Sequence, residues 1–230
     1  MWRICSAMIL AGLAALAGGC GNAVNGDVTA TREGGSTVNG AIRVPAGQQV
    51  GPVSTVNGSI TIENGATAGA ARAVNGEIKV DTHATVESAA SVNGSVILGD
   101  SAHVKADVKS VNGEIELQKD SEVSGSVSTV DGAISLTDAR VGGGLRTVAA
   151  NIDIMGSSHV DGGILVEKNT GATFQTTSTS RPRIVIGPGA VVQGELTFKR
   201  EVQLYVSDKA SIGPVVGATA VVFSGDKPPG

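Results

Sequence analysis

Short alternations of apolar and polar residues recur along the chain, most of them just after a glycine. The segments share the form apolar–polar–apolar, and they are residues 42–44, 60–62, 78–80, 115–117, 134–136 and 152–154. Alternation with a period of two residues is typical of β-strands with one buried face. A further apolar residue follows six positions after most of these segments, as at Val50, Val86 and Val104. The pattern therefore predicts short strands on more than one side of a repeating unit.

A triplet, Val-Asn-Gly, marks the repeat. It occurs at 24–26, 38–40, 56–58, 74–76, 92–94 and 111–113, and Val-Asp-Gly follows at 130–132. From Val38 onward the step is 18 or 19 residues, a period that indicates stacked supersecondary units. One unit is too small to bury a core, so only stacking can pair its strands and close the interior. We therefore expect an all-β fold, a single-stranded parallel β-helix (solenoid) of about nine or ten coils.

The same apolar–polar–apolar alternation predicts the domain boundaries. The β-helix is expected over residues 24–224, because the alternation returns at 184–186 and 204–206 after the triplet itself is lost. An insertion near 170–183, rich in Thr and Ser, breaks the period and is expected to be a protruding loop. Residues 225–230 are expected to form a tail that blunts the exposed strand edge. Right-handed connections between parallel strands are the rule, so a right-handed helix is favoured over the left-handed hexapeptide type.

The N-terminus has the features of an export signal. Arg3 is followed by an uncharged apolar run that is too short to span a membrane. The sequence Leu-Ala-Gly-Gly-Cys that ends at Cys20 resembles the lipobox of bacterial lipoproteins. That resemblance implies that residues 1–19 are a cleaved signal peptide, that Cys20 is lipidated and that residues 20–23 form a short linker. An ordinary secretory signal is the alternative.

Composition narrows the range of functions. The chain is mildly acidic, with a formal net charge of −4 at pH 7, and its Lys and Arg residues are scattered, which argues against nucleic-acid binding. Only 2% of the residues are aromatic, so the core must be aliphatic and stacking platforms for sugars are scarce. Once the signal is removed, Cys20 is the only cysteine, and no disulfide can form within the mature chain.

No reaction is predicted from the titratable residues. His83, His103 and His159 fall in different columns or in coils that are far apart, so neither a metal site nor a cofactor is expected. Polysaccharide-cleaving β-helices need acids that converge in one groove, and here the acids are dispersed. We therefore expect no enzymatic activity.

The asparagine of each triplet is expected to stack in a structural column at one corner of the helix. Asn tolerates the left-handed conformation of a tight corner, and stacked amides can hydrogen-bond along the column. The expected ladder consists of Asn39, Asn57, Asn75, Asn93 and Asn112, followed by Asp131. The residue before each Val forms a second column, with Thr37, Thr55 and Thr129, which is similar to the threonine ranks of ice-binding β-helices. Mixed charges at the neighbouring outward positions argue against ice binding.

The insertion near 170–183 is the one candidate recognition site, because long loops on rigid scaffolds often bind ligands. A solvated insertion without a ligand is the alternative. Its candidate residues are Thr176, Thr177, Thr179, Arg181 and Arg183.

Asn-Gly repeats behind a lipoprotein signal resemble the adhesin-like β-helix proteins of bacterial envelopes and, more distantly, the polymer-forming bactofilins. The resemblance covers about residues 24–222. It implies a lipid-anchored structural or adhesive surface protein. Gly21 in place of Asp after the cysteine implies, by resemblance to Gram-negative lipoproteins, the outer membrane. The expected partners are the membrane, through the N-terminal lipid, and an envelope polysaccharide or protein. The alternatives are end-to-end self-association into a scaffold and a polysaccharide-binding or polysaccharide-degrading role.

Overall fold

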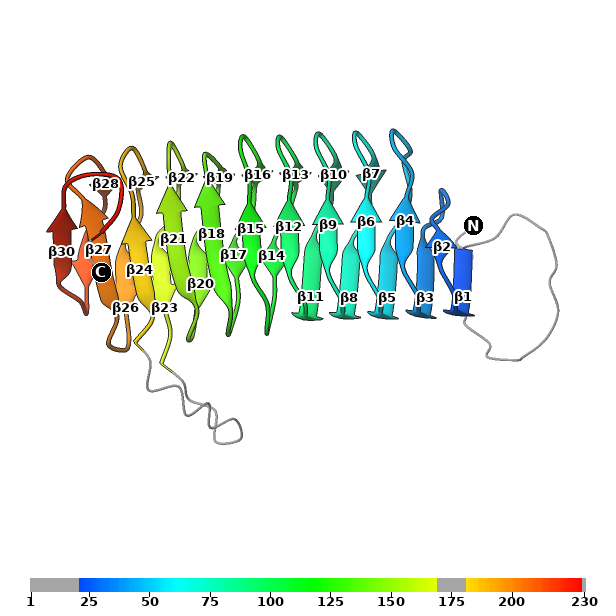
Figure 1. Ribbon diagram of the computed structural model, residues 1–230, viewed down its shortest axis with the longest axis horizontal. Helices are drawn as coiled ribbons and strands as arrows, with labels where there is room; N and C mark the ends of the chain where they lie inside the picture. The colour runs from blue at the N-terminus through cyan, green and yellow to red at the C-terminus, as the bar shows by residue number, and fades with distance from the viewer. Residues whose placement is uncertain (1–20, 169–180, 229–230) are drawn as a thin grey trace, which may run out of the picture.

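The computed structural model describes residues 21–168 and 181–228, and all regular structure in these ranges is β-strand. The strands form three parallel sheets of 11, 11 and 8 strands, here called sheets A, B and C. They stack into a straight rod along which the chain advances from one end to the other (Figure 1). The predicted all-β parallel solenoid is therefore confirmed. Within the described ranges there is no helix long and apolar enough to span a membrane.

The turns of the solenoid are here called rungs, and each rung from the third to the tenth contributes one strand to each sheet in the order A, B, C. The first, second and last rungs contribute strands to sheets A and B only. Sheet A contains β1 (Gly21–Asn25), β3 (Gly35–Asn39), β5 (Val53–Asn57), β8 (Ala71–Asn75), β11 (Ala89–Asn93), β14 (Val108–Lys109), β17 (Val127–Ser128), β20 (Leu145–Thr147), β23 (Ile164–Val166), β26 (Leu196–Phe198) and β29 (Val215–Val216). Sheet B contains β2 (Val28–Thr29), β4 (Ile42–Val44), β6 (Ile60–Ile62), β9 (Ile78–Val80), β12 (Val96–Leu98), β15 (Ile115–Leu117), β18 (Ala133–Thr137), β21 (Asn151–Met155), β24 (Arg183–Ile186), β27 (Gln203–Ser207) and β30 (Ala220–Phe223). Sheet C contains β7 (Thr67–Ala68), β10 (Thr85–Val86), β13 (His103–Val104), β16 (Glu122–Val123), β19 (Arg140–Val141), β22 (His159–Val160), β25 (Val191–Val192) and β28 (Ser211–Ile212).

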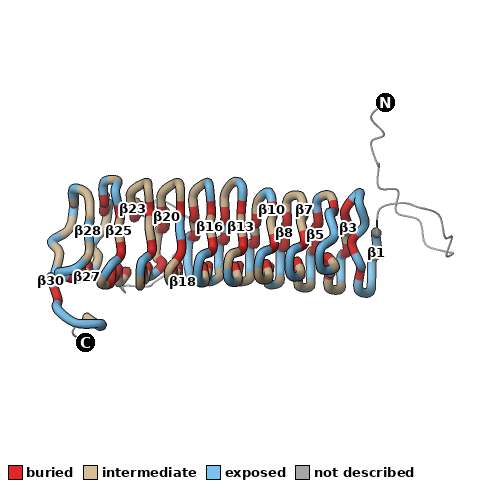
Figure 2. Tube along the Cα trace, turned by 90° about the horizontal axis from the view of Figure 1, so that it is seen from above, coloured by how far each residue is buried: buried red, intermediate tan, exposed pale blue. Residues whose placement is uncertain are grey.

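The core is a set of aliphatic columns inside the triangle of sheets. The register of the strands places equivalent residues of successive rungs next to one another. In the series Ile42, Ile60 and Ile78, for example, the side chains are 0–1% exposed. Buried residues line the inside of the tube from end to end (Figure 2). The strands predicted from the alternation are those of sheet B, and the second apolar column is that of sheet C.

The rod has 11 rungs, slightly more than the nine or ten expected. The difference lies at the ends, where the rungs are incomplete. In the first rung a tight bridge between Thr31 and Gly34 replaces a strand of sheet C, so the step from Asn25 to Asn39 is only 14 residues. The last rung ends at β30 without a strand in sheet C.

The predicted start of the solenoid and the predicted end of the inserted loop both shift. At the N-terminus β1 already starts at Gly21 and pairs with β3, so the expected linker 20–23 is part of the rod from Gly21 onward. Arg183 was expected in the loop but is the first residue of β24, where it pairs with Gln203. The right-handed sense of the helix stays a prediction.

The C-terminal tail does not cover the end of the rod, as far as it is described. Lys227 and Pro228 lie over the outer face of sheet B, beside Met155 and Val185. The end rung keeps three exposed valines, which are Val216 at 49%, Val221 at 49% and Val222 at 66%. The expectation of a tail that blunts this edge is thus not met by residues 225–228.

Candidate functional site

The most regular surface feature is the corner where each strand of sheet A ends and the chain turns into sheet B. This corner runs along the lower edge of the rod in Figure 1, where β1, β3, β5, β8 and β11 end. It carries a column of exposed valines, 38–62% accessible, beside a column of asparagines. We call these residues the valine–asparagine edge, and they are Val24, Val38, Val56, Val74, Val92, Val111, Val130, Asn25, Asn39, Asn57, Asn75, Asn93 and Asn112.

The asparagine amides form one continuous chain of hydrogen bonds. Each Nδ2 donates to the Oδ1 of the preceding rung, over 2.8 Å from Asn39 to Asn25 and 3.0 Å from Asn112 to Asn93. The intervening bonds, through Asn57 and Asn75, measure 2.8–2.9 Å. The ladder thus begins one rung earlier than predicted, at Asn25.

Asp131 ends the ladder, because a carboxylate has no N–H to donate to Asn112. Its backbone still pairs with that of Asn112, and its Oδ1 accepts a bond from the Gly132 amide at 2.9 Å. The expected left-handed conformation of the asparagines is wrong. Among described residues, the non-glycine residues with positive φ are His83, Ser101, Asp120 and Asp138, and all four lie at the corner between sheets B and C.

Close stacking explains the glycine that follows each asparagine. A Cβ built on Gly58 would overlap the backbone carbonyl of Gly40, and one on Gly76 would overlap that of Gly58. The neighbouring rungs approach so closely here that only hydrogen fits.

The hydroxyl column considered for ice binding points into the rod instead of out to solvent. Thr37, Thr55 and Thr129 are 3–4% exposed. Thr55 Oγ1 donates to the carbonyl oxygen of Gly40 at 3.2 Å, and Thr37 makes the same bond to Gly26. In sheet A the valines face solvent and the threonines face the core, which is the reverse of what the ice-binding comparison assumed.

A shallow groove crosses the outer face of sheet A from β14 to β26. Lys109, Ser128, Arg146 and Thr197 project into it, and glycines at the corner between sheets C and A leave it open. Its two acids, Asp107 and Glu195, lie four rungs apart, about 19 Å at the spacing of β-strands. Paired glycosidase carboxylates lie about 5–9.5 Å apart, so this groove does not bring together the acids that polysaccharide cleavage needs.

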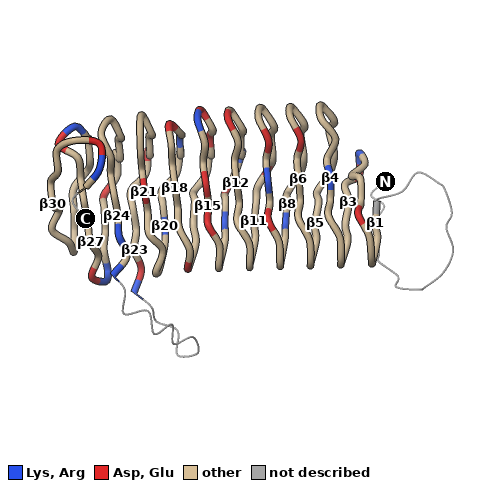
Figure 3. Tube along the Cα trace, viewed as in Figure 1, with Lys and Arg blue, Asp and Glu red and all other residues tan. Residues whose placement is uncertain are grey.

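The acids of the groove are held by local bonds. Asp107 Oδ1 accepts the Ser126 amide at 2.9 Å, and its other oxygen pairs with Lys109 at 2.9 Å. The bond from the Ser126 amide, followed by that from Lys109, lowers the pKa of Asp107. Positive and negative residues are scattered along the rod (Figure 3).

Another polar hollow lies at the corner between sheets B and C, around Asp138 and His159. Asp138 Oδ1 accepts both the amide and the hydroxyl of Ser157 at 2.8 Å, and these bonds lower the pKa of Asp138. His159 Nε2 lies 2.8 Å from Asp161, and His103 lies three rungs away in the same column. Among described residues there is no group of three His, Cys, Asp or Glu that could hold a metal ion.

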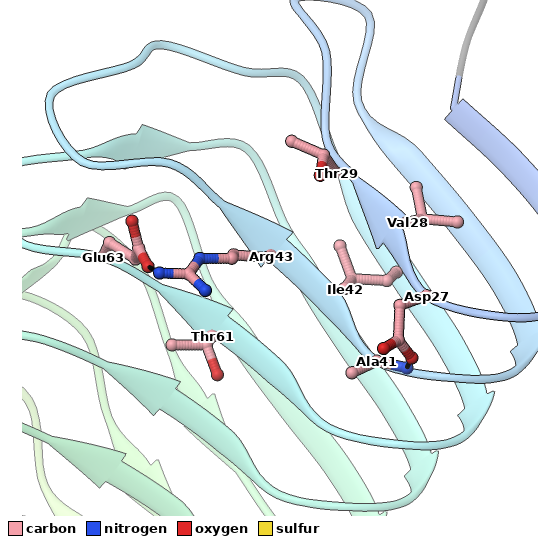
Figure 4. Close-up of a pocket in the computed structure, with 8 residues that line it drawn as sticks. All are labelled: Asp27, Val28, Thr29, Ala41, Ile42, Arg43, Thr61 and Glu63. Atoms are coloured by element: carbon pink, nitrogen blue, oxygen red, sulfur yellow. Dashed lines mark hydrogen bonds and ion pairs between the residues drawn. The ribbon is translucent and has the colours of Figure 1, made fainter.

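The hollow nearest the N-terminal end lies on sheet B (Figure 4). Arg43 and Glu63 form an ion pair on one side, and Asp27 accepts the amide of Ala41 at 2.8 Å on the other. These bonds tie neighbouring rungs together, and every charged group in the hollow has a partner within it.

The predicted recognition loop is only partly described. Thr176, Thr177 and Thr179 lie outside the described residues, as do the signal peptide and Cys20. Arg181 pairs with Glu201 at 2.9 Å.

The second arginine of the predicted loop is held on sheet B. Its guanidinium lies 5.5 Å from the centre of the Tyr205 ring, and its Nη1 is 3.7 Å from Asp153. Burial raises the pKa of Asp153, and the charge of Arg183 partly opposes the shift. Arg183 is therefore fixed within the wall of the rod.

No protein-family model, no curated protein and no solved structure matches the chain.

Proposed function

We propose that the chain is a lipid-anchored protein of the cell envelope, in the outer membrane of a Gram-negative bacterium, that acts as a structural or adhesive surface module without catalytic activity. One observation carries the proposal. The first strand, β1, starts at Gly21, directly after Cys20, and is the end strand of sheet A. A lipid on Cys20 would therefore hold the rod by one end.

The length and regularity of the rod support such a role. Eleven rungs at about 4.8 Å each give a reach of roughly 50 Å from an N-terminal anchor. Solenoids offer long side surfaces whose features repeat at the spacing of the rungs, and such surfaces suit extended contacts. The valine–asparagine edge is the longest surface of this kind in the described rod.

Substitution of Cys20 tests the anchor. We expect Cys20→Ser to abolish incorporation of labelled palmitate and to move the protein from the membrane fraction to the soluble exported fraction. Cys5→Ser is the matched control, because that residue lies inside the predicted signal, and it should leave both properties unchanged. Retention of Cys20→Ser in the membrane fraction with the same label would contradict the proposal.

End-to-end polymerisation is the second candidate, and the exposed end rung favours it. β30 has a neighbour on one side only, and Val216, Val221 and Val222 remain exposed there. Unpaired strand edges are templates for pairing with another chain. Light scattering over a hundredfold range of concentration should show growing mass if the ends stack, and Val221→Lys should suppress that growth. A mass that stops at a defined small oligomer would contradict polymerisation.

A further inference from the structure

We propose that the valine–asparagine edge is a docking surface for a second copy of this chain, packed side by side and parallel, with rung facing rung. The partner is a copy of the same chain because the edge repeats at the rise of a β-solenoid and because its flanking charges complement themselves. This inference does not depend on the proposed anchor.

The edge leaves an unusual amount of apolar surface in water. Seven valines in consecutive rungs are 38–62% exposed, which leaves roughly 450 Å² uncovered, near the largest apolar patch of a typical monomer. They form a single line about 29 Å long, since the strands and bridges that carry them pair in register. A line of this kind is complementary to a surface with the same repeat.

The area is sufficient for a dimer when the flanks are added. Two facing valine columns bury about 900 Å², and a stable interface needs about 1,200–2,000 Å² in total. The asparagine column and the residues on either side supply the remainder. The ladder already satisfies one N–H and the carbonyl oxygen of each stacked amide, which lowers the cost of desolvating the column.

Charges flank the edge in a pattern that repeats within single rungs. Two residues before the valine, sheet A presents Arg72 in the fourth rung and Lys109 in the sixth. Two residues after the asparagine, the same two rungs present Glu77 and Glu114. The second, third, fifth and seventh rungs are neutral at both positions, with Ser36 and Ala41, Ser54 and Ser59, Ala90 and Ser95, and Ser128 and Ala133. The first rung is the exception, because it has Asn22 on one flank and Asp27 on the other, and Asp27 accepts the Ala41 amide within the chain. The seventh rung also has Asp131 in the position of the asparagine. A base on one flank is therefore matched by an acid on the other.

These matched charges do not pair within one chain. Neither Arg72, Glu77 nor Glu114 has an ion pair among the described residues, and all three are exposed; Lys109 pairs with its own Asp107. Three of the four members therefore have no ion pair within the described chain, although the charge of Glu77 adds to the effects of Asp81 that raise the pKa of Lys79.

Symmetry decides the orientation of the second copy. A two-fold axis parallel to the rod places the basic flank of one copy opposite the acidic flank of the other, and each rung faces the same rung. Arg72 then faces the partner's Glu77, and Lys109 faces the partner's Glu114. A two-fold axis across the rod instead places basic flank against basic flank. The charges thus select the parallel pair, in which both N-termini lie at the same end.

Cysteine cross-linking of the full chain in intact cells tests both contact and orientation. Val56→Cys, Val92→Cys and Val130→Cys introduce a thiol at the third, fifth and seventh rungs. A short bismaleimide should convert each of these variants to a covalent dimer. Lys79→Cys, on the outer face of sheet B, and the unsubstituted chain are the controls and should stay monomeric.

The pattern of bands separates the outcomes. Dimers at all three rungs support the parallel pair. A dimer at one rung only indicates antiparallel rods, absence of dimers at every rung excludes a second copy, and a product with a different protein identifies another occupant. Each of these last three results overturns the proposal.

Charge exchange tests the flanks independently. In the Val92→Cys background, Glu77→Arg should lower the dimer fraction at limiting expression by about tenfold, because like charges then face each other. Adding Arg72→Glu should restore it. Both residues are exposed, so protease resistance should match that of the parent chain. Equal dimer fractions in the single and double variants would refute the role of these charges.

Discussion

The substitution Gly58→Ala tests most directly how closely the rungs stack. Alanine here would place its Cβ on the backbone carbonyl of Gly40 in the preceding rung, which cannot rotate away, and it would also have to adopt the φ of +153° that Gly58 has. The two rungs must separate at this corner. The separation breaks two hydrogen bonds. One runs from the Gly40 backbone amide to the Asn57 carbonyl oxygen (2.9 Å), and the other from Asn57 Nδ2 to Asn39 Oδ1 in the ladder (2.8 Å).

A third bond at the same corner is lost as well, from the Ile42 amide to Ser59 at 2.8 Å. At about 1 kcal/mol for each bond, Gly58→Ala should cost about 3 kcal/mol or more of unfolding free energy. Gly65 provides the matched control. Its φ is +65°, but a Cβ there meets no atom within 4 Å, so Gly65→Ala should cost only about 1 kcal/mol of backbone strain.

Ser101 occupies the position of Gly65 two rungs further on, with φ +56°. Ser101→Gly should therefore stabilise the rod by about 0.5 kcal/mol, the relief of strain less the added freedom of the unfolded chain. Urea unfolding followed by circular dichroism measures all three changes. A cost for Gly65→Ala equal to that of Gly58→Ala would refute the explanation by close stacking.

Three further predictions follow from the ladder, the core and the acids. Asp131→Asn should extend the amide ladder and raise stability by about 0.5–1 kcal/mol, whereas Asn112→Asp should lower it similarly; equal effects in urea titrations would count against the ladder. Ile78→Asp should cost several kcal/mol, because it buries a charge, and Lys79→Gln next door should cost less than about 1 kcal/mol; similar unfolding midpoints would show that the register is wrong. The pKa of Asp138 is lowered from 3.8, so its carboxylate stabilises the fold above that pH and the benefit disappears as pH falls through the lower native pKa. The stability difference between the parent and Asp138→Asn should therefore shrink in acid, and a difference independent of pH would exclude the assigned bonds.

The fold could be predicted because one period controls both strand spacing and burial. The alternation at residues such as Ile42 and Ile60 identifies sheet B without further information, since only stacking can bury the inward face of such short strands. The end rungs were harder to count, because the step of 14 residues at Asn39 departs from the period.

The phase of sheet A was misjudged for a physical reason. The comparison with ice-binding β-helices placed Thr55 on the surface, because threonine is polar and the valine beside it is a residue type that strands commonly bury. A signal was present in Val53, an apolar residue three positions before Val56 that recurs as Ala71, Ala89, Val108 and Val127 and sets the inward phase. Thr55 can point inward because its hydroxyl bonds to the Gly40 carbonyl. The consequence is the exposed valine column, which the sequence did not suggest.

The backbone conformation of the asparagines was also misjudged. Asn is favoured in left-handed corners, but here the ladder alone accounts for it, and the left-handed positions lie at the corner between sheets B and C. Residues such as His83 and Ser101 carry no local mark of that conformation. Only their alignment with Gly47 and Gly65 in the repeat reveals it.

Energy transfer from the rod to the membrane tests the central claim most directly, that the rod is held by its N-terminal end. A donor dye on Arg43→Cys, in the second rung, and one on Val221→Cys, in the last, would be measured in separate samples against acceptor lipids in membranes containing the full chain. We predict strong transfer from the second rung and weak transfer from the last, which lies about 43 Å further along the rod. Equal transfer from both positions would show a rod that lies flat on the membrane and would contradict the account.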